Sequence, residues 1–469
     1  MINKKISLTK KNFLLLLYLI ILALIGPAIY WLNEGTSNTI NNFNTTENEL
    51  LKERLSVGNQ VLITANKNVL KKEASQAFAK GNYDVAATKY AAALRSNSND
   101  PEALIYLNNA IALASDNTYK IGVSVPIGGN LDVAKEILRG VAQAQNEINQ
   151  AGGIKGNQVV VEIANDDNNS ELAEEIAGNF VRDDDILAVI GHNDSNVSIA
   201  AAPVYQQNGL VMVTPTSSAD VIPTMGTYIF RTTPNTRALA STLADYAIEE
   251  ENVTDIAVCI DSESEVSKSF KEEFIWSIYK SGGKIVPTKC DFSGGDFLPS
   301  RVISHAISDG AEALLLAPSV KRVDKAAEVA LANDDRLTLL GSHSTVTYDT
   351  LKKGQTAVNG MVSAVAWYPT PESNLAFEKD AIELWGGLVG WRTAMAYDAA
   401  KTIFAGLTLG TNRDQLQQVL ANRQFSAEGS SETINFLPSG DRNMLGQLVQ
   451  IQPGERSGTG FDFISLENR

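Results

Sequence analysis

From Tyr119 onward, short apolar runs alternate with amphipathic stretches. The runs YKIGVSVPI, QVVVEIAND and ILAVIGH are continuous and rich in β-branched residues, without a polar residue at every second position. This composition is typical of parallel strands that helices cover on both faces. Between the runs, apolar residues recur at helical spacing and predict helices over 130–150, 170–181 and 195–207. Residues 119–235 therefore predict a doubly wound α/β lobe.

The same alternation starts again at residue 236. Its apolar runs are DIAVCID, GKIVPTKCDF, EALLLAPS and TLLGSH, and the helices predicted around them cover 236–249, 267–280, 297–308 and 323–332. A repeated strand–helix alternation of this kind predicts a second doubly wound lobe. The expected fold class is thus α/β, with two Rossmann-like lobes and a cleft between them.

The C-terminal third predicts crossovers between the lobes. The run GMVSAVAWYP is expected to leave the second lobe, and helices around 374–385 and 391–408 to rejoin the first. The runs TINFLPSG and LGQLVQIQP are expected as strands of the second lobe. The two-lobed domain then covers 119–455, with lobe 1 at 119–235 plus 374–410, lobe 2 at 236–362 plus 411–455, and a tail at 456–469.

An uncharged apolar run covers residues 13–32 near the N-terminus. Twenty helical residues span about 30 Å, the thickness of a bilayer core. Four lysines and no acid stand in residues 1–12, which predicts that this end stays in the cytoplasm and the body lies outside. A cleaved signal peptide is the alternative. Because the run is long for one and no A-x-A site follows it, we predict a single-pass anchor in the cytoplasmic membrane.

Residues 33–60 are polar and predict a linker, whereas 61–115 have a helical pattern. Here the spacing of Gly81, Tyr83, Ala86 and Tyr90 resembles a tetratricopeptide repeat. It predicts one helix before Gly81, a second over 84–95 and a third over 101–113. Such units normally need about three copies to bury their faces, and this segment has one and a half. Two interpretations stay open: a helical spacer packed on its neighbour, or a module that binds a protein partner.

Charge and residue inventory exclude several classes of function. The net charge is −15, and an acidic body repels the phosphate backbone of nucleic acids. The three histidines and two cysteines form no HExxH or paired-cysteine motif, so we expect no metal site. No phosphate-binding glycine motif is present, and we expect no cofactor. His192, Asp194 and Ser195 stand too close together in the chain to converge as a catalytic triad, so we expect no enzyme.

Several segments together carry a family pattern. They are GVSVPIGG, NEINQAGGIKGNQVVVEIANDD, AVIGHNDSNVSIAAAPVYQQNGLVMVTPTSS, YIFRTTPN and INFLPSGDR. In this order, across 119–455, they resemble the leucine/isoleucine/valine-binding proteins of the type I periplasmic binding family, which deliver ligands to ABC permeases. The resemblance implies an extracytoplasmic receptor that closes two lobes around a small amino-acid-like ligand and whose partners are ABC permease subunits. The alternative is a sensor whose closed lobes are read by a protein partner, through the helical repeat segment.

Three serines are candidate ligand groups in the first lobe. Ser195 begins a predicted helix just after a strand, at the carboxyl edge where open α/β sheets present ligands. Its hydroxyl and the free amides there suit a carboxylate, although Ser195 is alternatively a plain helix cap. Ser217 and Ser218 end the next strand at the same edge. The resemblance implies that hydroxyls and backbone groups at these positions hold the carboxylate and ammonium of the ligand.

The second lobe departs from the family pattern. Glu265 and Ser319 stand where family members often have aromatic residues, and His343 stands where an acid often meets the ammonium of the ligand. We expect Glu263, Glu265 or Asp194 to neutralise an ammonium instead. The half of the pocket that grips the amino group and the side chain therefore differs, and the identity of the ligand stays open.

Trp367 and Tyr368 stand in the predicted crossover run. They could supply the missing aromatic wall of the pocket, or they could be hinge packing. The sequence favours neither.

Cys259 and Cys290 are the only cysteines, and they lie in consecutive apolar runs of the second lobe. An oxidising compartment permits a disulfide between neighbouring strands if their register agrees. The alternative is a pair of buried thiols. Because Cys259 is in the middle of its run and Cys290 is near the end of its own, we favour two free thiols.

Overall fold

The computed structural model describes residues 50–65, 67–115, 117–369 and 375–466. Leu55–Arg469 forms one compact unit, distinct from Met1–Arg54. The predicted cytoplasmic segment at 1–12, the predicted anchor at 13–32 and most of the predicted linker lie outside the described residues. Among the helices that are described, none is both long enough and apolar enough to cross a bilayer.

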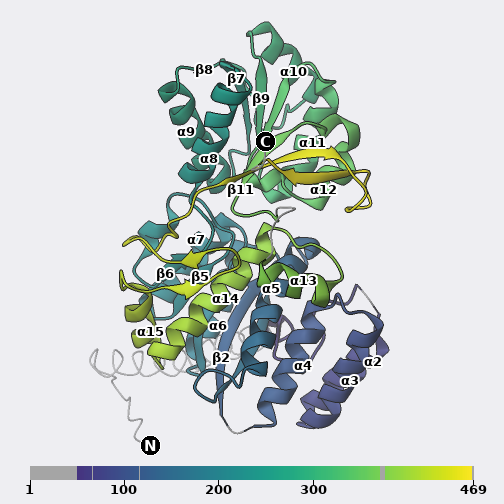
Figure 1. Cartoon of the computed structure of the whole chain (residues 1–469), viewed down its shortest axis with the longest axis vertical. Coiled ribbons are helices and arrows are strands. Elements are labelled where there is room, and N and C mark those ends of the chain that lie inside the picture. Colours follow the sequence, from purple (N-terminus) through teal and green to yellow (C-terminus); the bar gives the residue numbers. More distant parts are fainter. Residues whose placement is uncertain (1–49, 66, 116, 370–374, 467–469) are drawn as a thin grey trace, which may run out of the picture. The chain divides into compact units, whose positions relative to one another are not determined.

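The first lobe is built on a six-stranded sheet with the order β1-β3-β2-β4-β5-β6 (Figure 1). Its strands are β1 (Leu55–Ser56), β2 (Thr118–Val125), β3 (Gln158–Asn165), β4 (Ile186–Ile190), β5 (Val211–Thr214) and β6 (Ile229–Arg231). Strands β2 to β6 are parallel, and β1 pairs antiparallel with the outer edge of β3. The parallel sheet expected from the continuous apolar runs is confirmed.

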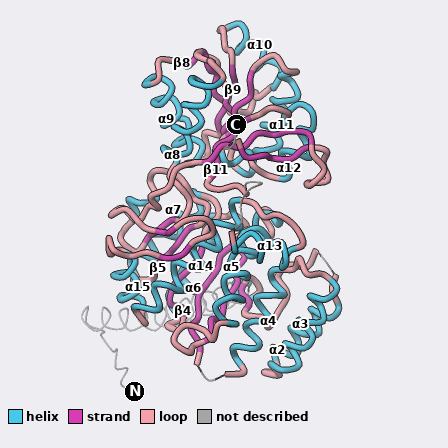
Figure 2. Tube along the Cα trace, viewed as in Figure 1, coloured by secondary structure: helices cyan, strands magenta, loops and turns pink. Residues whose placement is uncertain are grey.

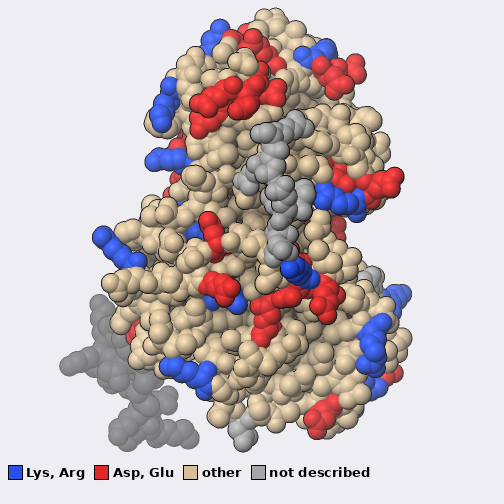
Figure 3. Space-filling view, in the orientation of Figure 1, with Lys and Arg blue, Asp and Glu red and all other residues tan. Residues whose placement is uncertain are grey.

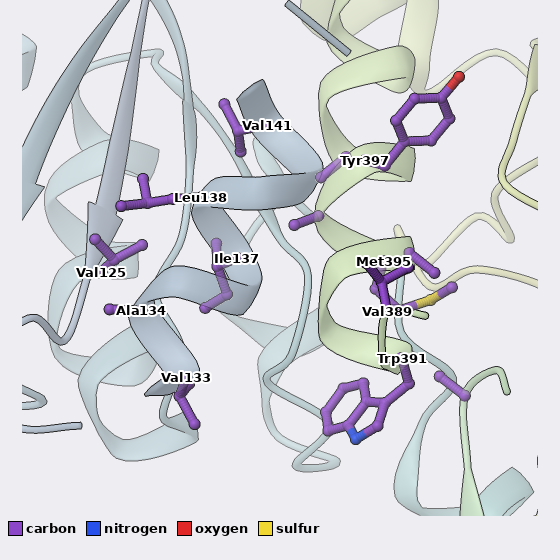
Figure 4. Close-up of a cluster of buried hydrophobic side chains, with 14 of the residues drawn as sticks. Val125, Val133, Ala134, Ile137, Leu138, Val141, Val389, Trp391, Met395 and Tyr397 are labelled. Atoms are coloured by element: carbon purple, nitrogen blue, oxygen red, sulfur yellow. The ribbon is translucent and has the colours of Figure 1, made fainter. Parts of the chain in front are cut away.

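Helices lie on both sides of this sheet (Figure 2). They are α5 (Leu131–Gln150), α6 (Ser170–Arg182), α7 (Ser195–Gln207), α13 (Ala376–Trp385), α14 (Trp391–Leu409) and α15 (Arg413–Leu420), with the short η1 (Ile222–Met225). Helix α14 packs on α5, and the buried side chains of Ala134 and Leu138 on the other side of α5 point toward Val125 of β2 (Figure 4). The two helices approach so closely at Gly140 that an added Cβ atom would lie 2.1 Å from the carbonyl oxygen of Thr393. The contact holds the C-terminal helices in the first lobe, as predicted.

Three helices precede β2, at the positions the sequence predicts: α2 (Val69–Ala79), α3 (Tyr83–Ser96) and α4 (Pro101–Leu113). Helix α4 packs on α5 and on β3. The side chain of Asn109 on α4 accepts from the amide of Val161 at 2.9 Å and donates to its carbonyl at 2.7 Å. Because β1 pairs with β3 only at Ile163 and Ala164, Asn109 satisfies backbone groups of β3 that β1 does not reach. The helical segment is therefore built into the first lobe, in agreement with the spacer interpretation.

The second lobe has a seven-stranded sheet with the order β15-β14-β11-β10-β9-β7-β8. Its strands are β7 (Asp255–Ile260), β8 (Lys284–Ile285), β9 (Ala313–Ala317), β10 (Thr338–Gly341), β11 (Val362–Val365), β14 (Gln447–Pro453) and β15 (Phe461–Ser465). Its helices are α8 (Thr236–Asp245), η2 (Tyr246–Glu250), α9 (Glu265–Lys280), α10 (Pro299–Ser308), η3 (Val320–Arg322), α11 (Val323–Asn333), η4 (His343–Thr345), α12 (Tyr348–Gly354) and η5 (Gln355–Val358). On the face drawn in Figure 3, acidic side chains gather at the upper end of this lobe.

The C-terminal part differs from the predicted domain bounds. Helix α15 packs on α14 and β5 of the first lobe, although 411–455 was assigned to the second. The expected strand TINFLPSG contributes only β13 (Thr433–Ile434), which pairs with β12 (Ala427–Glu428) in a separate small sheet. The predicted tail contains β15, which joins the second sheet beside β14. These are antiparallel pairings between short segments, and the apolar pattern carries no information about which strand they join.

The prediction of two free thiols is wrong, because Cys259 and Cys290 form a disulfide. Beyond β8 the chain returns to β7, where Asp291 forms a parallel bridge with Ile260. Each cysteine immediately precedes one of these two residues, so their Cα atoms are 4.6 Å apart. Cys290 does lie outside a strand, as expected, but the segment around it still pairs in parallel with β7.

Candidate functional site

The carboxyl edge of the first sheet carries a short polar loop between β4 and α7. Asp194 ends this loop and is the N-cap of α7, because its Oδ1 accepts from the amide of Asn196 at 2.9 Å. Burial raises the pKa of Asp194, and the positive charge of Lys321 opposes that effect. Ser195 is therefore not the helix cap, and its alternative interpretation is wrong.

The three predicted serines have different surroundings. Ser195 is buried, and its Oγ accepts from the amide of Ala219 at 3.4 Å. The Oγ of Ser217 lies 2.8 Å from the Oγ of Ser198 and donates to the carbonyl of His192 at 3.1 Å. Ser217 thus holds the loop after β4 in place.

Ser218 points to the other lobe. Its Oγ lies 3.1 Å from Nε2 of His343, which belongs to η4 at the end of β10. Burial, with a smaller effect from the positive charge of Arg392, lowers the pKa of His343 to about 3. The imidazole is therefore neutral at physiological pH, and Ser218 and His343 form a hydrogen bond across the cleft.

The acidic and hydroxyl candidates of the second lobe pair with other residues of that lobe. The carboxylate of Glu265 pairs with Lys268 at 2.5 Å and is 41% exposed. Glu263 pairs with Arg322 at 3.3 Å on the surface. Ser319 donates to Asp261 at 2.5 Å. The structure does not bring these three side chains to the ligand groups of the first lobe.

A small cavity lies where the two lobes meet, with a volume of about 20 Å³. It is lined by Asn193, Asp194, Ser195, Thr216, Val266, Val320, His343, Ser344, Trp391 and Arg392. Of the predicted site residues, Asp194, Ser195 and His343 line it. A volume of this size holds about one water molecule. Ligand pockets are usually about 300 Å³ or larger, so the side chains that line the cavity must move apart to admit a solute between the closed lobes.

Hydrogen bonds around the cavity join the lobes directly. Asn196 of α7 donates to the carbonyl of Glu263 at 2.8 Å and accepts from the amide of Glu265 at 2.9 Å. Lys321 of η3 donates to the carbonyl of Asn168 at 2.8 Å. Each bond pairs one lobe with the other, so together they stabilise the closed arrangement. Glu265 takes part in this contact between the lobes through its backbone amide.

Sequence reasoning missed Trp391 and Arg392, which begin α14. The Arg392 side chain is buried, and its Nη1 donates to the carbonyl of Val346 at 3.0 Å and to Glu136 at 3.3 Å. Its guanidinium lies 4.4 Å from the ring centre of Trp391. Among the described residues its Nε has no hydrogen-bond partner, and the same holds for Nδ1 of His343. The one available signal was an arginine in the first turn of a mostly apolar predicted helix.

Other polar residues near the cleft serve packing. Nδ1 of His192 lies 2.7 Å from Asp166, and its Nε2 lies 3.2 Å from the hydroxyl of Tyr205. Both ring nitrogens therefore have partners other than Ser195. In the crossover, Trp367 packs against Phe377 and Tyr368 donates to the carbonyl of Phe463 at 2.8 Å. Neither of the two aromatic residues lines the cavity. The described part of the chain holds no group of three or more residues suited to a metal ion.

Comparison with known proteins adds to this geometry. The family profile described as a periplasmic binding protein matches residues 118–450. The Leu/Ile/Val-binding protein homolog 3 of Brucella melitensis is 30% identical over 181 residues, which are 37% of this chain and 49% of that protein. The chain thus spans about half the length of this curated relative.

Solved structures show the same fold at low sequence identity. A leucine-binding protein from Thermotoga maritima has a TM-score of 0.66 and 21% identity, over 74% of this chain and 97% of that one. An ABC-transporter solute-binding protein from Rhodopseudomonas palustris, solved with p-hydroxybenzoic acid, has a TM-score of 0.64 and 18% identity, over 75% and 96%. With the lobes, the crossovers and the matched residues in agreement, the chain belongs to the periplasmic binding protein family.

Proposed function

We propose that this protein captures a small amino-acid-like solute by closing its two lobes over it, and delivers that solute to an ABC permease. The observation that carries the proposal is the cavity at the lobe boundary, with hydrogen bonds from lobe to lobe around it. A ligand that contacts both sides favours closure, because it binds the closed state more tightly than the open state.

The residues that line the cavity support a ligand with both polar and apolar parts. Arg392 and Asp194 offer opposite charges, and Ser195, Thr216 and Asn193 offer neutral hydrogen-bonding groups. Val266, Val320 and Trp391 provide apolar surface. An amino acid combines the same features. The names of two similar proteins support the same class of ligand, since one is a Leu/Ile/Val-binding protein homolog and the other a leucine-binding protein.

The family suggests an extracytoplasmic location, and the lysine-flanked apolar run at 13–32 supports a membrane anchor. We therefore propose that the solute-binding body lies outside the cytoplasmic membrane, close to its permease. A sensor would use the same lobe closure but pass it to a protein partner, for which the surface of α2 and α3 is the candidate. Purifying the full chain from its membrane and identifying the copurifying subunits distinguishes the two.

A ligand screen tests the proposal. The purified full-length chain is mixed with the common amino acids, their amides and small aromatic acids, and thermal unfolding and calorimetry are recorded. We expect at least one amino acid to bind and to raise the midpoint of unfolding, since a ligand at a hundred times its Kd stabilises by ~2.7 kcal/mol. We also expect that ligand to lower the radius of gyration in X-ray scattering, because the lobes close.

Asn196→Ala provides the matched variant for lobe closure. It removes two bonds between the lobes and leaves the residues that line the cavity in place, so the same ligand should bind more weakly. A screen without any bound amino acid would contradict the proposed ligand class. Binding with an unchanged radius of gyration would contradict closure.

A further inference from the structure

We propose that Arg392 binds the carboxylate of the ligand and Asp194 binds its ammonium, so that the site selects a zwitterion. This inference rests on the proposed function and names the groups that give it specificity. It differs from the expectation in which the amino end of α7 and the serines beside it hold the carboxylate.

The amino end of α7 is already occupied. The backbone amides of Asn196 and Val197 donate to the carboxylate of Asp194, which takes the place that an external anion would use. A ligand carboxylate at this position would also meet the negative charge of Asp194. Repulsion between the two carboxylates therefore directs the anionic group of the ligand elsewhere.

Arg392 is the permanently charged cation among the residues that line the cavity. It is buried, it donates to Glu136 at 3.3 Å through Nη1 alone, and its Nε has no partner among the described residues. The Glu136 side chain is 29% exposed, so water screens that ion pair. A guanidinium with an unused buried N–H group is well suited to a carboxylate, which it can bind through charge-assisted hydrogen bonds.

His343 offers a second donor from the other lobe. Its Nε2 bonds to the hydroxyl of Ser218, and its Nδ1 has no partner among the described residues. When Ser218 donates to Nε2, the single proton of the neutral imidazole lies on Nδ1 and can be donated to the ligand. A carboxylate bound by Arg392 of the first lobe and His343 of the second would join the lobes.

The opposite charge is nearby but separate. Asp194 and Arg392 line the same cavity, yet no ion pair joins them in the part of the chain that the structure describes. Two buried opposite charges that do not pair with one another match the two ends of an amino acid. The wall formed by Trp391 and Val266 then faces the apolar body of the ligand.

Crossed variants and crossed ligands test the assignment. The probes are L-leucine, L-leucinamide and 4-methylpentanoate, with the corresponding trio from L-phenylalanine. The amide lacks the carboxylate and the acid lacks the ammonium. Arg392→Gln should weaken the amino acid and the acid on the order of ten- to a hundredfold, with the amide unchanged, since a charge-assisted bond is lost. Asp194→Asn should weaken the amino acid and the amide, with the acid unchanged.

Two controls make the result specific. Arg392→Lys keeps the charge and should bind the amino acid more tightly than Arg392→Gln. Arg237→Gln removes an exposed arginine that pairs with Glu273 on the surface, and it should change none of the affinities. If Arg392→Gln weakens the amide as strongly as the amino acid, or leaves the amino acid unchanged, the inference is overturned while the proposed function stands. If the wild-type chain binds neither amino acid, the proposed ligand and this inference both fail.

Discussion

Two buried hydroxyl groups of the first lobe, those of Ser195 and Ser217, differ in what they can still bind. The Oγ of Ser217 lies between the Oγ of Ser198 and the carbonyl of His192, so its hydrogen-bonding capacity is used inside the lobe. The Oγ of Ser195 accepts one long bond at 3.4 Å, and the residue lines the cavity. At the scale of the residue, Ser195 has the capacity to bind a ligand and Ser217 has a structural role.

Replacing each serine by alanine should separate these roles. Ser195→Ala should weaken the best amino-acid ligand by about 0.5–1.5 kcal/mol in calorimetry, the usual value of a bond to a neutral group. Ser217→Ala should instead lower the free energy of unfolding by about 0.5–1.5 kcal/mol in urea, because it removes buried hydrogen bonds to Ser198 and His192, both of which keep other partners.

The size of the Ser195 effect is itself informative. A loss of about 1.5–3 kcal/mol would indicate a bond to a charged group, place the carboxylate at α7 and contradict the assignment to Arg392. An unchanged affinity would show that Ser195 does not contact the ligand.

At the scale of the element, each sheet has a strand that its short outer neighbour covers only in part, and the two lobes secure that strand differently. Asn109 of α4 bonds the backbone of Val161, on the part of β3 that the two-residue strand β1 does not cover. In the second lobe β8 covers only two residues of β7, and the disulfide joins the chain again five residues beyond β8, at Cys290. The disulfide therefore adds a covalent bond where backbone hydrogen bonds of Ile260 to Cys290 and Phe292 resume the pairing with β7.

Removing the disulfide should destabilise the second lobe. For a separation of 31 residues, the loss of the loop constraint predicts that Cys259→Ala with Cys290→Ala lowers the free energy of unfolding by ~3–4 kcal/mol. Urea unfolding of the variant, beside reduced and oxidised wild-type protein, measures the effect. Alkylation without reductant should label neither cysteine of the wild type, and two labelled cysteines would contradict the bond.

At the scale of the whole molecule, the balance between open and closed lobes depends on bonds that only the closed state makes. One of them joins Ser218 to His343, and the buried imidazole lies near the guanidinium of Arg392. A protonated imidazole in this position would be repelled by Arg392. The neutral form is therefore part of what stabilises closure.

Acid should open the lobes. The pKa of His343 is lowered to about 3 in the folded, closed protein, against an ordinary value near 6.5 when it is exposed. The exposed state binds more protons between these values, so the stabilisation is complete above about pH 6.5 and is lost as the pH falls toward 3. Burial raises the pKa of Asp194, which acts in the opposite sense, so His343→Gln is compared with the wild type.

The measurement is the radius of gyration and ligand affinity between pH 7 and pH 4. The wild type should expand and bind more weakly at the acid end, and His343→Gln should change less. Equal pH dependence of both proteins would show that another group controls opening.

The sequence by itself determined the elements and their grouping into two lobes. Helices such as Ser195–Gln207 begin and end where the apolar period predicts, because this signal is local along the chain. The tertiary structure alone decided which side chains meet. The Cys259–Cys290 register, the cleft position of Trp391 and Arg392, and the sheet that β15 joins all depend on residues far apart in sequence. Packing and strand register between such residues leave no periodic pattern in the chain, which is why Asp194 and Ser195 at the sheet edge were predictable and Trp391 and Arg392 were not.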